Sequence, residues 1–400
     1  MADTVHEPNA NESADERFVT PGPARLAETA EAAGISRIHM IAWRDLDDPE
    51  AGGSELHAHE IASRWADAGI EVSMRTSGIA GQGPTAQRSG YAVERRSGRY
   101  GVFPSVISSG LRGRAAPGDA LVEIWNGMPF FSPLWFSGPR ITVLHHVHDE
   151  MWQMVLPGLL GKVGDTIERR VAPPIYRRER IVTLSESSRE EIVERLRLAA
   201  ERVVVAPPGI APKFRPSGAR SDRPLVVAVG RLVPVKRFDV LIKELAQVRR
   251  EVPDLEAIII GEGYERPALE SLRRSLGAES WLSLPGFVDE SGLIDAYQRA
   301  WVVASASLRE GWGMTLTEAA ACGTPCVATN IAGHRDAVSN QQSGILVDDL
   351  SSLSTGLVDV LTDPTLRADL QAGAQRWSER FSWDATAQTA LEQLALSARR

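Results

Sequence analysis

The chain has 400 residues, of which 43% are hydrophobic, and it carries a formal net charge of -8 at pH 7. This length exceeds one ordinary hydrophobic core and predicts two domains of about 150–200 residues each. The acidic balance argues against a general nucleic-acid-binding protein, and no apolar run approaches the ~18 residues that indicate a membrane-spanning helix.

The N-terminal segment is acidic and polar, which predicts a mostly disordered tail over residues 1–34. It lacks the basic and apolar stretches of a secretory signal peptide. Cys322 and Cys326 are the only cysteines, too few for a disulfide framework, and we expect both to be buried free thiols. These features together favour a cytoplasmic protein.

Short apolar runs alternate with amphipathic segments in the first half of the chain. We expect a helix over residues 55–69, and strands over residues 37–43, 70–77, 120–126, 140–146 and 180–186. Such alternation is typical of βαβ units around a parallel sheet. The pattern predicts an N-terminal Rossmann-like domain over residues 35–207.

The second half repeats this pattern over residues 208–382. We expect a helix over residues 240–252, and strands over residues 224–232, 255–263, 280–286, 301–307 and 325–330. The proline-containing segment 203–216 predicts a stiff linker between the domains, and residues 383–400 predict an amphipathic C-terminal helix. Ligands of such sheets bind at the carboxyl ends of the strands, so we expect a site in the cleft between the domains.

Two carboxylates, Glu310 and Glu318, flank a glycine-rich turn in "EGWGMTLTE". Gly313 allows a ligand to approach the backbone, and a helix is expected over residues 315–322, whose free N–H groups would hold a phosphate. Glu318 has a second interpretation, because a Thr315-x-x-Glu318 capping box would use it to satisfy a backbone N–H. Glu310 has no comparable structural role and is expected to face the cleft.

This E-x7-E pattern resembles the signature of retaining glycosyltransferases with the GT-B fold, family 4 in particular. The resemblance extends to "VGRLVPVKRFD", "IIIGEGYERPALE", "LPGFV" and "EAAACGTPCVATNIAGHRDAV", and it covers most of residues 37–395. It implies an α/β fold with two Rossmann-like domains whose parallel sheets face each other across a cleft. Residues 35–207 would form the acceptor side and residues 208–382 the nucleotide-sugar side, with the helix over 383–400 packing back on the first domain.

The resemblance also implies roles for the residues of this turn. Glu310 would contact the donor sugar, and Glu318 would hold the ribose hydroxyls of the nucleotide. Backbone amides around Gly313, Met314 and Thr315 would hold the distal phosphate.

Arg231 and Lys236 lie five residues apart, just after an expected strand, in a chain with four lysines. Two fixed cations stabilise the charge that develops on a leaving diphosphate more strongly in the transition state than in the ground state. The resemblance assigns this role to them. The alternative is an exposed basic loop.

Two further stretches end at the same expected cleft. Gly52 and Gly53 precede the first helix and would let a backbone amide approach the donor phosphate, although two glycines before a helix are also ordinary turn chemistry. The family has one histidine close to the donor sugar, which we align with His145. His146 and His148 stay open as alternatives, and at least one of the three is expected to be scaffold.

The loops at residues 261–265 and 286–288 resemble the nucleobase and ribose surroundings of the family, with Gly263, Phe287 and Val288 as candidates. They use mostly backbone atoms and therefore do not reveal the base.

Asp45-x-Asp47 resembles a pair that binds metal in another glycosyltransferase fold. We expect it to be a solvated turn, because Arg231 and Lys236 can neutralise the diphosphate without a metal. We therefore expect no metal site and no cofactor.

Residues 150–180 combine apolar residues with a cluster of arginines at positions 169, 170, 177, 178 and 180. One interpretation is a basic amphipathic segment that contacts an anionic membrane, as in some relatives. The interpretation that we favour is a core-facing helix with a solvated basic side.

These patterns predict a retaining, metal-independent hexosyltransferase of cell-envelope or glycan biosynthesis. It would move a hexose, with mannose as the first choice, from a GDP- or UDP-sugar to a hydroxyl of a glycan or lipid-linked acceptor. The alternatives are a GT-B sugar-nucleotide epimerase and a catalytically silent nucleotide-sugar-binding protein. A dinucleotide oxidoreductase is disfavoured, because "GGSELH" and "GEGYERP" do not match its G-x-G-x-x-G turn.

Overall fold

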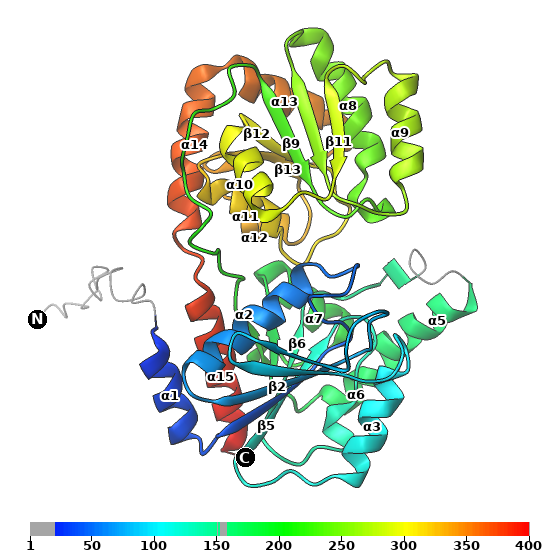
Figure 1. The fold of residues 1–400 in the computed structure, drawn as a ribbon, viewed down its shortest axis with the longest axis vertical. Coiled ribbons are helices and arrows are strands. Elements are labelled where there is room, and N and C mark those ends of the chain that lie inside the picture. Colours follow the sequence, from blue (N-terminus) through cyan, green and yellow to red (C-terminus); the bar gives the residue numbers. More distant parts are fainter. Residues whose placement is uncertain (1–20, 150, 153–157, 400) are drawn as a thin grey trace, which may run out of the picture.

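The computed structural model describes residues 21–149, 151–152 and 158–399. Two α/β domains lie one above the other along the long axis of the molecule, and each is built on its own sheet (Figure 1). The strand orders are β3-β4-β2-β1-β5-β6-β7-β8 and β11-β10-β9-β12-β13-β14. The predicted fold class, with two Rossmann-like domains, is confirmed.

The first sheet is parallel except for its edge pair β3–β4, which is antiparallel. Alternate residues of β5 join different hydrophobic clusters, Val122 with the helices of one face and Leu121 with those of the other. Every residue of β5 is buried, as expected for a parallel strand covered on both sides. The strands are β1 (Arg37–Ile41), β2 (Glu71–Thr76), β3 (Thr85–Arg88), β4 (Tyr91–Arg95), β5 (Asp119–Trp125), β6 (Arg140–Leu144), β7 (Ile181–Thr183) and β8 (Val203–Val205).

The helices of the first domain include a π-helical turn between α5 and α6. They are α1 (Pro23–Ala32), α2 (Gly53–Asp67), α3 (Val102–Arg112), α5 (Leu159–Thr166), the π-helix (Ile167–Val171), α6 (Ala172–Tyr176) and α7 (Glu186–Leu196), with 3-10 turns at Ser132–Leu134 and Ala200–Arg202.

The second sheet is parallel throughout. Val226 and Val227 of β9 point into separate clusters on its two faces. Its strands are β9 (Leu225–Val229), β10 (Glu256–Ile260), β11 (Leu282–Gly286), β12 (Val302–Ser305), β13 (Cys326–Thr329) and β14 (Gly344–Val347). Its helices are α8 (Phe238–Glu251), α9 (Arg266–Ser275), α10 (Glu290–Arg299), α11 (Met314–Ala321), α12 (His334–Ala337), α13 (Leu353–Thr362) and α14 (Pro364–Ser378), with 3-10 turns at Pro234–Lys236 and Leu350–Ser352.

The last helix, α15 (Trp383–Ala398), leaves the second domain and packs on the first (Figure 1). Leu391 and Leu394 of this helix are fully buried in the core of the first domain. Helix α1 lies against α15 and buries Leu26 and Ala30. The prediction of a disordered tail over 1–34 is therefore wrong for Pro23–Ala32, whereas residues 1–20 lie outside the described part of the chain.

The structure also corrects the predicted linker over 203–216, because Val203–Val205 forms β8 at the edge of the first sheet. Three further strands were not expected from the sequence, namely β3, β4 and β14. Both cysteines are free and buried, in agreement with the sequence.

Candidate active site

The start of α2 meets two elements of the second domain at the boundary between the domains. A Cβ atom on Gly52 would lie 3.9 Å from Nε of Arg231, and a Cβ on Gly53 would lie 3.0 Å from Sδ of Met314. Four predicted site residues from three separate segments therefore meet at one place. A side chain at position 53 would press on Met314, so glycine permits this approach.

Glu55 holds the first turn of α2 in position. Its carboxylate accepts hydrogen bonds from the Gly52 N–H at 2.8 Å and the Ser54 hydroxyl at 2.9 Å, and the Arg44 guanidinium donates to it at 3.0 Å. The Asn126 side chain, at the end of β5, donates to the Ser54 hydroxyl at 2.9 Å. This network fixes the glycine turn at the carboxyl ends of the strands.

Glu310 and Lys236 form an ion pair in the second domain. The Ser307 hydroxyl also donates to the Glu310 carboxylate, at 2.8 Å. Burial acts to raise the pKa of Glu310, but the Lys236 charge, the nearby His334 and the hydrogen bonds from Lys236 and Ser307 together hold it below its usual value. Glu310 is therefore an anion at neutral pH, able to accept hydrogen bonds from sugar hydroxyls.

Arg231 is exposed and, among the residues that the structure describes, it makes no ion pair. Its position depends on close contact between the loops that follow β9 and β10. A Cβ on Gly263 would lie 2.2 Å from the Leu232 carbonyl oxygen, and the Leu232 N–H donates to the Glu262 carbonyl at 2.8 Å. Gly263 therefore acts through backbone packing next to Arg231.

Helix α11 begins directly after the turn that contains Gly313, whose φ of 130° favours glycine. Its first amides, at Met314 and Thr315, precede the intrahelical hydrogen bonds, which begin at Leu316. The helix has no side-chain cap, so the capping-box interpretation of Glu318 is wrong. Backbone N–H groups at this end suit a phosphate.

The Glu318 carboxylate instead accepts a hydrogen bond from the Tyr297 hydroxyl at 3.1 Å. Burial raises the pKa of Glu318 to about 7, which outweighs the lowering effects of Tyr297 and of the Lys213 charge. The two acids of the turn thus have opposite pKa shifts.

The three histidines after β6 have different surroundings. His145 is buried edge-on against the ring of His57, at 5.1 Å between ring centroids, and burial lowers the pKa of His145 to about 4. His146 stacks on His148 at 4.7 Å, and a Cβ on Gly311 would lie 3.3 Å from Nδ1 of His146. His145 and His146 are therefore both neutral at pH 7 and close to the domain boundary, since burial also lowers the pKa of His146.

His148 is supported from the first domain by Glu168, a fully buried residue of the π-helix. The Glu168 carboxylate accepts from the backbone N–H of His148 at 3.1 Å, that of Asp149 at 3.2 Å and the indole N–H of Trp152 at 2.9 Å. This arrangement fixes the loop after β6 and is a scaffold role for His148.

The turn around Gly311 is bound directly to the first domain. The Ser185 hydroxyl donates to the Gly311 carbonyl at 3.1 Å, and the Gly333 N–H donates to the Ser187 hydroxyl at 2.8 Å. The Arg309 guanidinium donates to the Val147 carbonyl at 3.0 Å. The candidate site is therefore assembled from both domains.

Sequence reasoning missed His334, which lies near Glu310. Its Nδ1 is 2.9 Å from the Thr329 carbonyl oxygen, and a Cβ on Gly313 would lie 3.1 Å from its ring. The motif "AGHRDAV", which contains His334, was part of the family resemblance, but no function was assigned to its histidine. Ser307 and His57 were also missed, although each lies within a few residues of a predicted site residue. Tyr297 carries no local signal, because it reaches Glu318 from 21 positions away.

Trp312 is buried and packs edge-on against Phe381, at 5.1 Å between ring centroids. This tryptophan thus belongs to the core behind the turn rather than to the cleft.

The remaining candidates lie after β11. Phe287 is 83% exposed and follows Gly286, while Val288 is half-buried. Tyr264, after β10, is 71% exposed. These two exposed aromatic rings belong to loops that extend from neighbouring strands of the sheet.

Asp45 is not in a solvated turn, as predicted, because it is 2% exposed. The Arg95 guanidinium donates to Asp45 at 2.8 Å and to Asp47 at 2.6 Å, and Arg88 pairs with both acids. Their carboxylates are therefore occupied by arginines. Within the described part of the chain, no group of three or more His, Cys, Asp or Glu residues is arranged to hold a metal ion.

Helix α5 exposes most of its apolar side chains, with Leu159 77%, Leu160 65% and Val163 45% exposed. The favoured interpretation of a core-facing helix is therefore wrong for α5. Residues 153–157 of the same segment lie outside the described residues. Among the described helices, none has the length and apolar character needed to cross a membrane.

Comparison with known proteins agrees with this geometry. Residues 51–214 match the family model "Glycosyltransferase Family 4", and residues 210–377 match "Glycosyl transferases group 1". The chain is 30% identical to a D-inositol 3-phosphate glycosyltransferase of Salinispora arenicola, over 93% of this chain and 92% of the relative.

Two solved structures show the same fold at low identity. Sucrose-phosphate synthase from Thermosynechococcus elongatus superposes with a TM-score of 0.74 at 20% identity, covering 88% of this chain and 97% of its own. HepE from Anabaena, in complex with UDP and glucose, superposes with a TM-score of 0.69 at 19% identity, covering 90% and 100%. The protein is an enzyme with the GT-B fold, and it belongs to family 4 of the glycosyltransferases.

Proposed function

We propose that this glycosyltransferase moves a hexose from a uridine diphosphate sugar to a hydroxyl of D-inositol 3-phosphate or a similar phosphorylated polyol, with retention of anomeric configuration. The acceptor follows the name of the curated relative, and the base follows the UDP in the HepE structure. Neither name favours mannose, so our first choice of donor sugar has no support beyond the sequence. A glycan or lipid-linked acceptor remains the alternative.

The observation that carries this proposal is the meeting of two helix N-termini with Arg231, which has no ion-pair partner in the part of the chain that the structure describes. Gly52 and Gly53 open α2, Met314 opens α11, and Arg231 lies between the two domains beside Gly52. Helix N-termini and guanidinium groups both favour phosphate oxygens. A diphosphate placed there would bridge the two domains.

The donor would extend from this diphosphate in two directions. Glu310, an anion, would accept hydrogen bonds from the sugar hydroxyls, and Glu318 would accept them from the ribose. Lys236, which pairs with Glu310, would also contact the diphosphate. The neutral ring of His145 would line the sugar from the first domain. Phe287, Val288 and the loop at Gly263 would surround the nucleoside.

The transfer step would then break the bond between the anomeric carbon and the diphosphate oxygen. The acceptor oxygen bonds to that carbon on the same face, and its proton passes to the leaving diphosphate. Arg231 and Lys236 would stabilise the charge on the diphosphate, because fixed cations aimed at developing charge lower the barrier. This role is the basis for proposing a reaction that needs no metal.

Transfer can be tested with a panel of UDP-sugars and GDP-mannose, with D-inositol 3-phosphate as acceptor and a metal chelator present. We expect release of UDP that depends on the acceptor, and a product whose anomeric configuration by NMR matches the donor. Release only with GDP-mannose would contradict the proposed base. A product with inverted configuration would contradict the proposed stereochemistry, and conversion of the donor alone would favour an epimerase.

We also propose that α5 contacts a membrane surface. Its exposed Leu159 and Leu160 support this, because contiguous exposed apolar side chains next to arginines suit an anionic interface. Replacing both leucines by serine should reduce co-sedimentation with phosphatidylglycerol-containing vesicles. Leu111→Ser on α3 is the matched control, since Leu111 is 65% exposed. Equal sedimentation of both variants would contradict this contact.

A further inference from the structure

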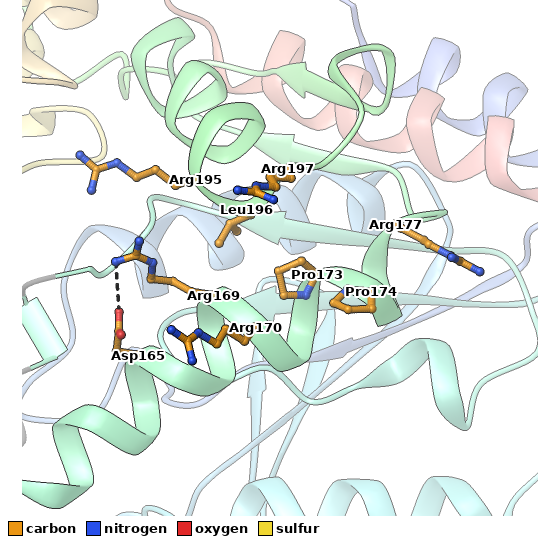
Figure 2. A pocket seen from close by; sticks show the side chains of 9 residues that line it. All are labelled: Asp165, Arg169, Arg170, Pro173, Pro174, Arg177, Arg195, Leu196 and Arg197. Carbon is orange, nitrogen blue, oxygen red and sulfur yellow. Dashed lines mark ion pairs between the residues drawn. The ribbon is translucent and has the colours of Figure 1, made fainter.

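A second cavity lies in the first domain, between the π-helix with α6 and the end of α7 (Figure 2). Its volume is about 600 Å³. None of its lining residues belongs to the candidate active site. Five of them are arginines, namely Arg169, Arg170, Arg177, Arg195 and Arg197.

Four of these arginines gather on one side of the cavity. In Figure 2, Arg195 and Arg197 lie on either side of Leu196, Arg169 and Arg170 lie below it, and Arg177 lies beyond two prolines. The cluster draws on two elements that are far apart in the sequence, the π-helix and the end of α7. The fold therefore concentrates positive charge here, although the chain as a whole carries a net charge of -8.

The carboxylates near the cavity neutralise only part of this charge. Arg169 pairs with Asp165 at 3.8 Å and with Asp149 at 3.4 Å, and Arg195 also pairs with Asp149. Over residues 21–149, 151–152 and 158–399, neither Arg170 nor Arg197 has an ion-pair partner. The guanidinium groups of Arg170 and Arg197 thus keep free hydrogen-bond donors, whereas Arg169 and Arg195 are paired with carboxylates.

The chemistry of this cluster selects for phosphate. A guanidinium group presents a planar fork of N–H donors that matches two oxygens of a phosphate, and such charge-assisted pairs are strong. The cavity volume lies in the range of small-molecule sites, roughly 300–1,000 Å³. Asp165 also lines the cavity and would oppose an anion on its own side, so the anion should sit nearer Arg170 and Arg197.

We propose that this cavity is a second anion site, which binds a ligand carrying at least two adjacent phosphate charges through Arg170 and Arg197. Arg169 and Arg195 would add long-range attraction while they stay paired with their carboxylates. The ligand could be a soluble phosphorylated molecule or the headgroup of an anionic lipid, because both present the same oxygens. Asp165 is a residue of α5, so the cavity adjoins the helix with the exposed leucines.

The test compares an Arg170→Gln/Arg197→Gln variant with wild type and with an Arg112→Gln/Arg114→Gln control. The control removes two exposed arginines outside the cavity, so both variants lose the same charge. Inorganic pyrophosphate is titrated into each protein by calorimetry. Binding in the donor cleft is common to all three proteins and cancels in the comparison.

Wild type and the control should show one more pyrophosphate site than the cavity variant, or a site that is at least about tenfold tighter. Sedimentation with phosphatidylcholine vesicles, with and without phosphatidylglycerol, identifies the source. Loss of vesicle binding in the cavity variant alone would indicate a lipid headgroup, and unchanged vesicle binding a soluble ligand. If the cavity variant equals the control in both experiments, there is no anion site here. Cooperative melting and unchanged sugar transfer would show that the variant is folded.

Discussion

The two acids of the 310–318 turn lie close together but have opposite environments. Glu310 pairs with a lysine and accepts from a serine, and its pKa is lowered despite burial. Glu318 accepts from one tyrosine, and burial raises its pKa to about 7. The charge on the first acid is stabilised by a neighbouring cation, whereas burial of the second acid favours its protonated form. The two acids of one turn therefore have different chemistry, which the variants below are designed to separate.

The largest effect should come from Glu310→Gln. The proposed contact with the donor sugar is lost and Lys236 is left without its partner, so the transfer rate should fall by about 10²–10³-fold. Steady-state kinetics with the wild-type donor measures this. Glu279→Gln is the control, because Glu279 is exposed and distant in sequence. A wild-type transfer rate in Glu310→Gln would show that Glu310 has no role in the reaction.

Lys236→Ala should reduce kcat by about a hundredfold, because a fixed cation at the leaving group is lost. The same change raises the pKa of Glu310, since Lys236 is the main influence that lowers it. Lys243→Ala, at an exposed position of α8, should behave as wild type. If both variants lose activity equally, the effect of Lys236→Ala comes from the lost positive charge of the protein and not from the position of Lys236.

The stability of the two glutamine variants should differ in sign. The Glu318 pKa is raised from 4.5 to about 7, so the folded protein holds a proton that the unfolded chain releases between these pH values. The wild type therefore loses stability as pH rises from about 4.5 to 7, and Glu318→Gln should be more stable at pH 8 by about 1–3 kcal/mol.

Glu310 has a lowered pKa, so it contributes stability that is present above its usual pKa and lost as pH falls through the folded value. Glu310→Gln should therefore be less stable than wild type at neutral pH, and the difference should shrink in acid. Urea unfolding at several pH values measures both variants. Identical pH dependence of the two would contradict their opposite environments.

The smallest effect should come from Gly53→Ala. Its Cβ would lie 3.0 Å from the flexible Met314 side chain, which can move, so we expect KM for the donor to rise a few-fold, roughly 0.5–1.5 kcal/mol in binding. Gly98→Ala is the control, because nothing lies within 4 Å of its added Cβ. An unchanged KM for the donor would indicate that the N-terminus of α2 does not contact it.

Local pattern was enough to predict the central strands and the charged residues of the site. Strand β3 was missed because its residues Thr85–Arg88 are half-exposed and carry no apolar run. Helix α1 was taken for disorder, since only tertiary packing on α15 and α2 gives it a buried face. Asp45 was misjudged because its partner Arg95 lies 50 positions away.

The same limit applies to the site. Glu310, Lys236 and Gly52 could be predicted from their residue types and their positions after strands. Tyr297 could not, because it reaches Glu318 from a helix 21 positions away. The capping box failed for a related reason, because the turn at Gly313 directs Glu318 toward Tyr297 and not toward its own helix start. Contacts between side chains that are distant in the sequence cannot be predicted from local sequence patterns.

The most direct test of the division between the two acids is the affinity of each variant for UDP and for the UDP-sugar. Calorimetry at pH 8 keeps the wild-type Glu318 mostly ionised. We predict that Glu318→Gln weakens both ligands alike by about tenfold, through the lost ribose contact. Glu310→Gln should leave UDP unchanged and weaken only the UDP-sugar. Equal weakening of UDP by both variants would contradict the account.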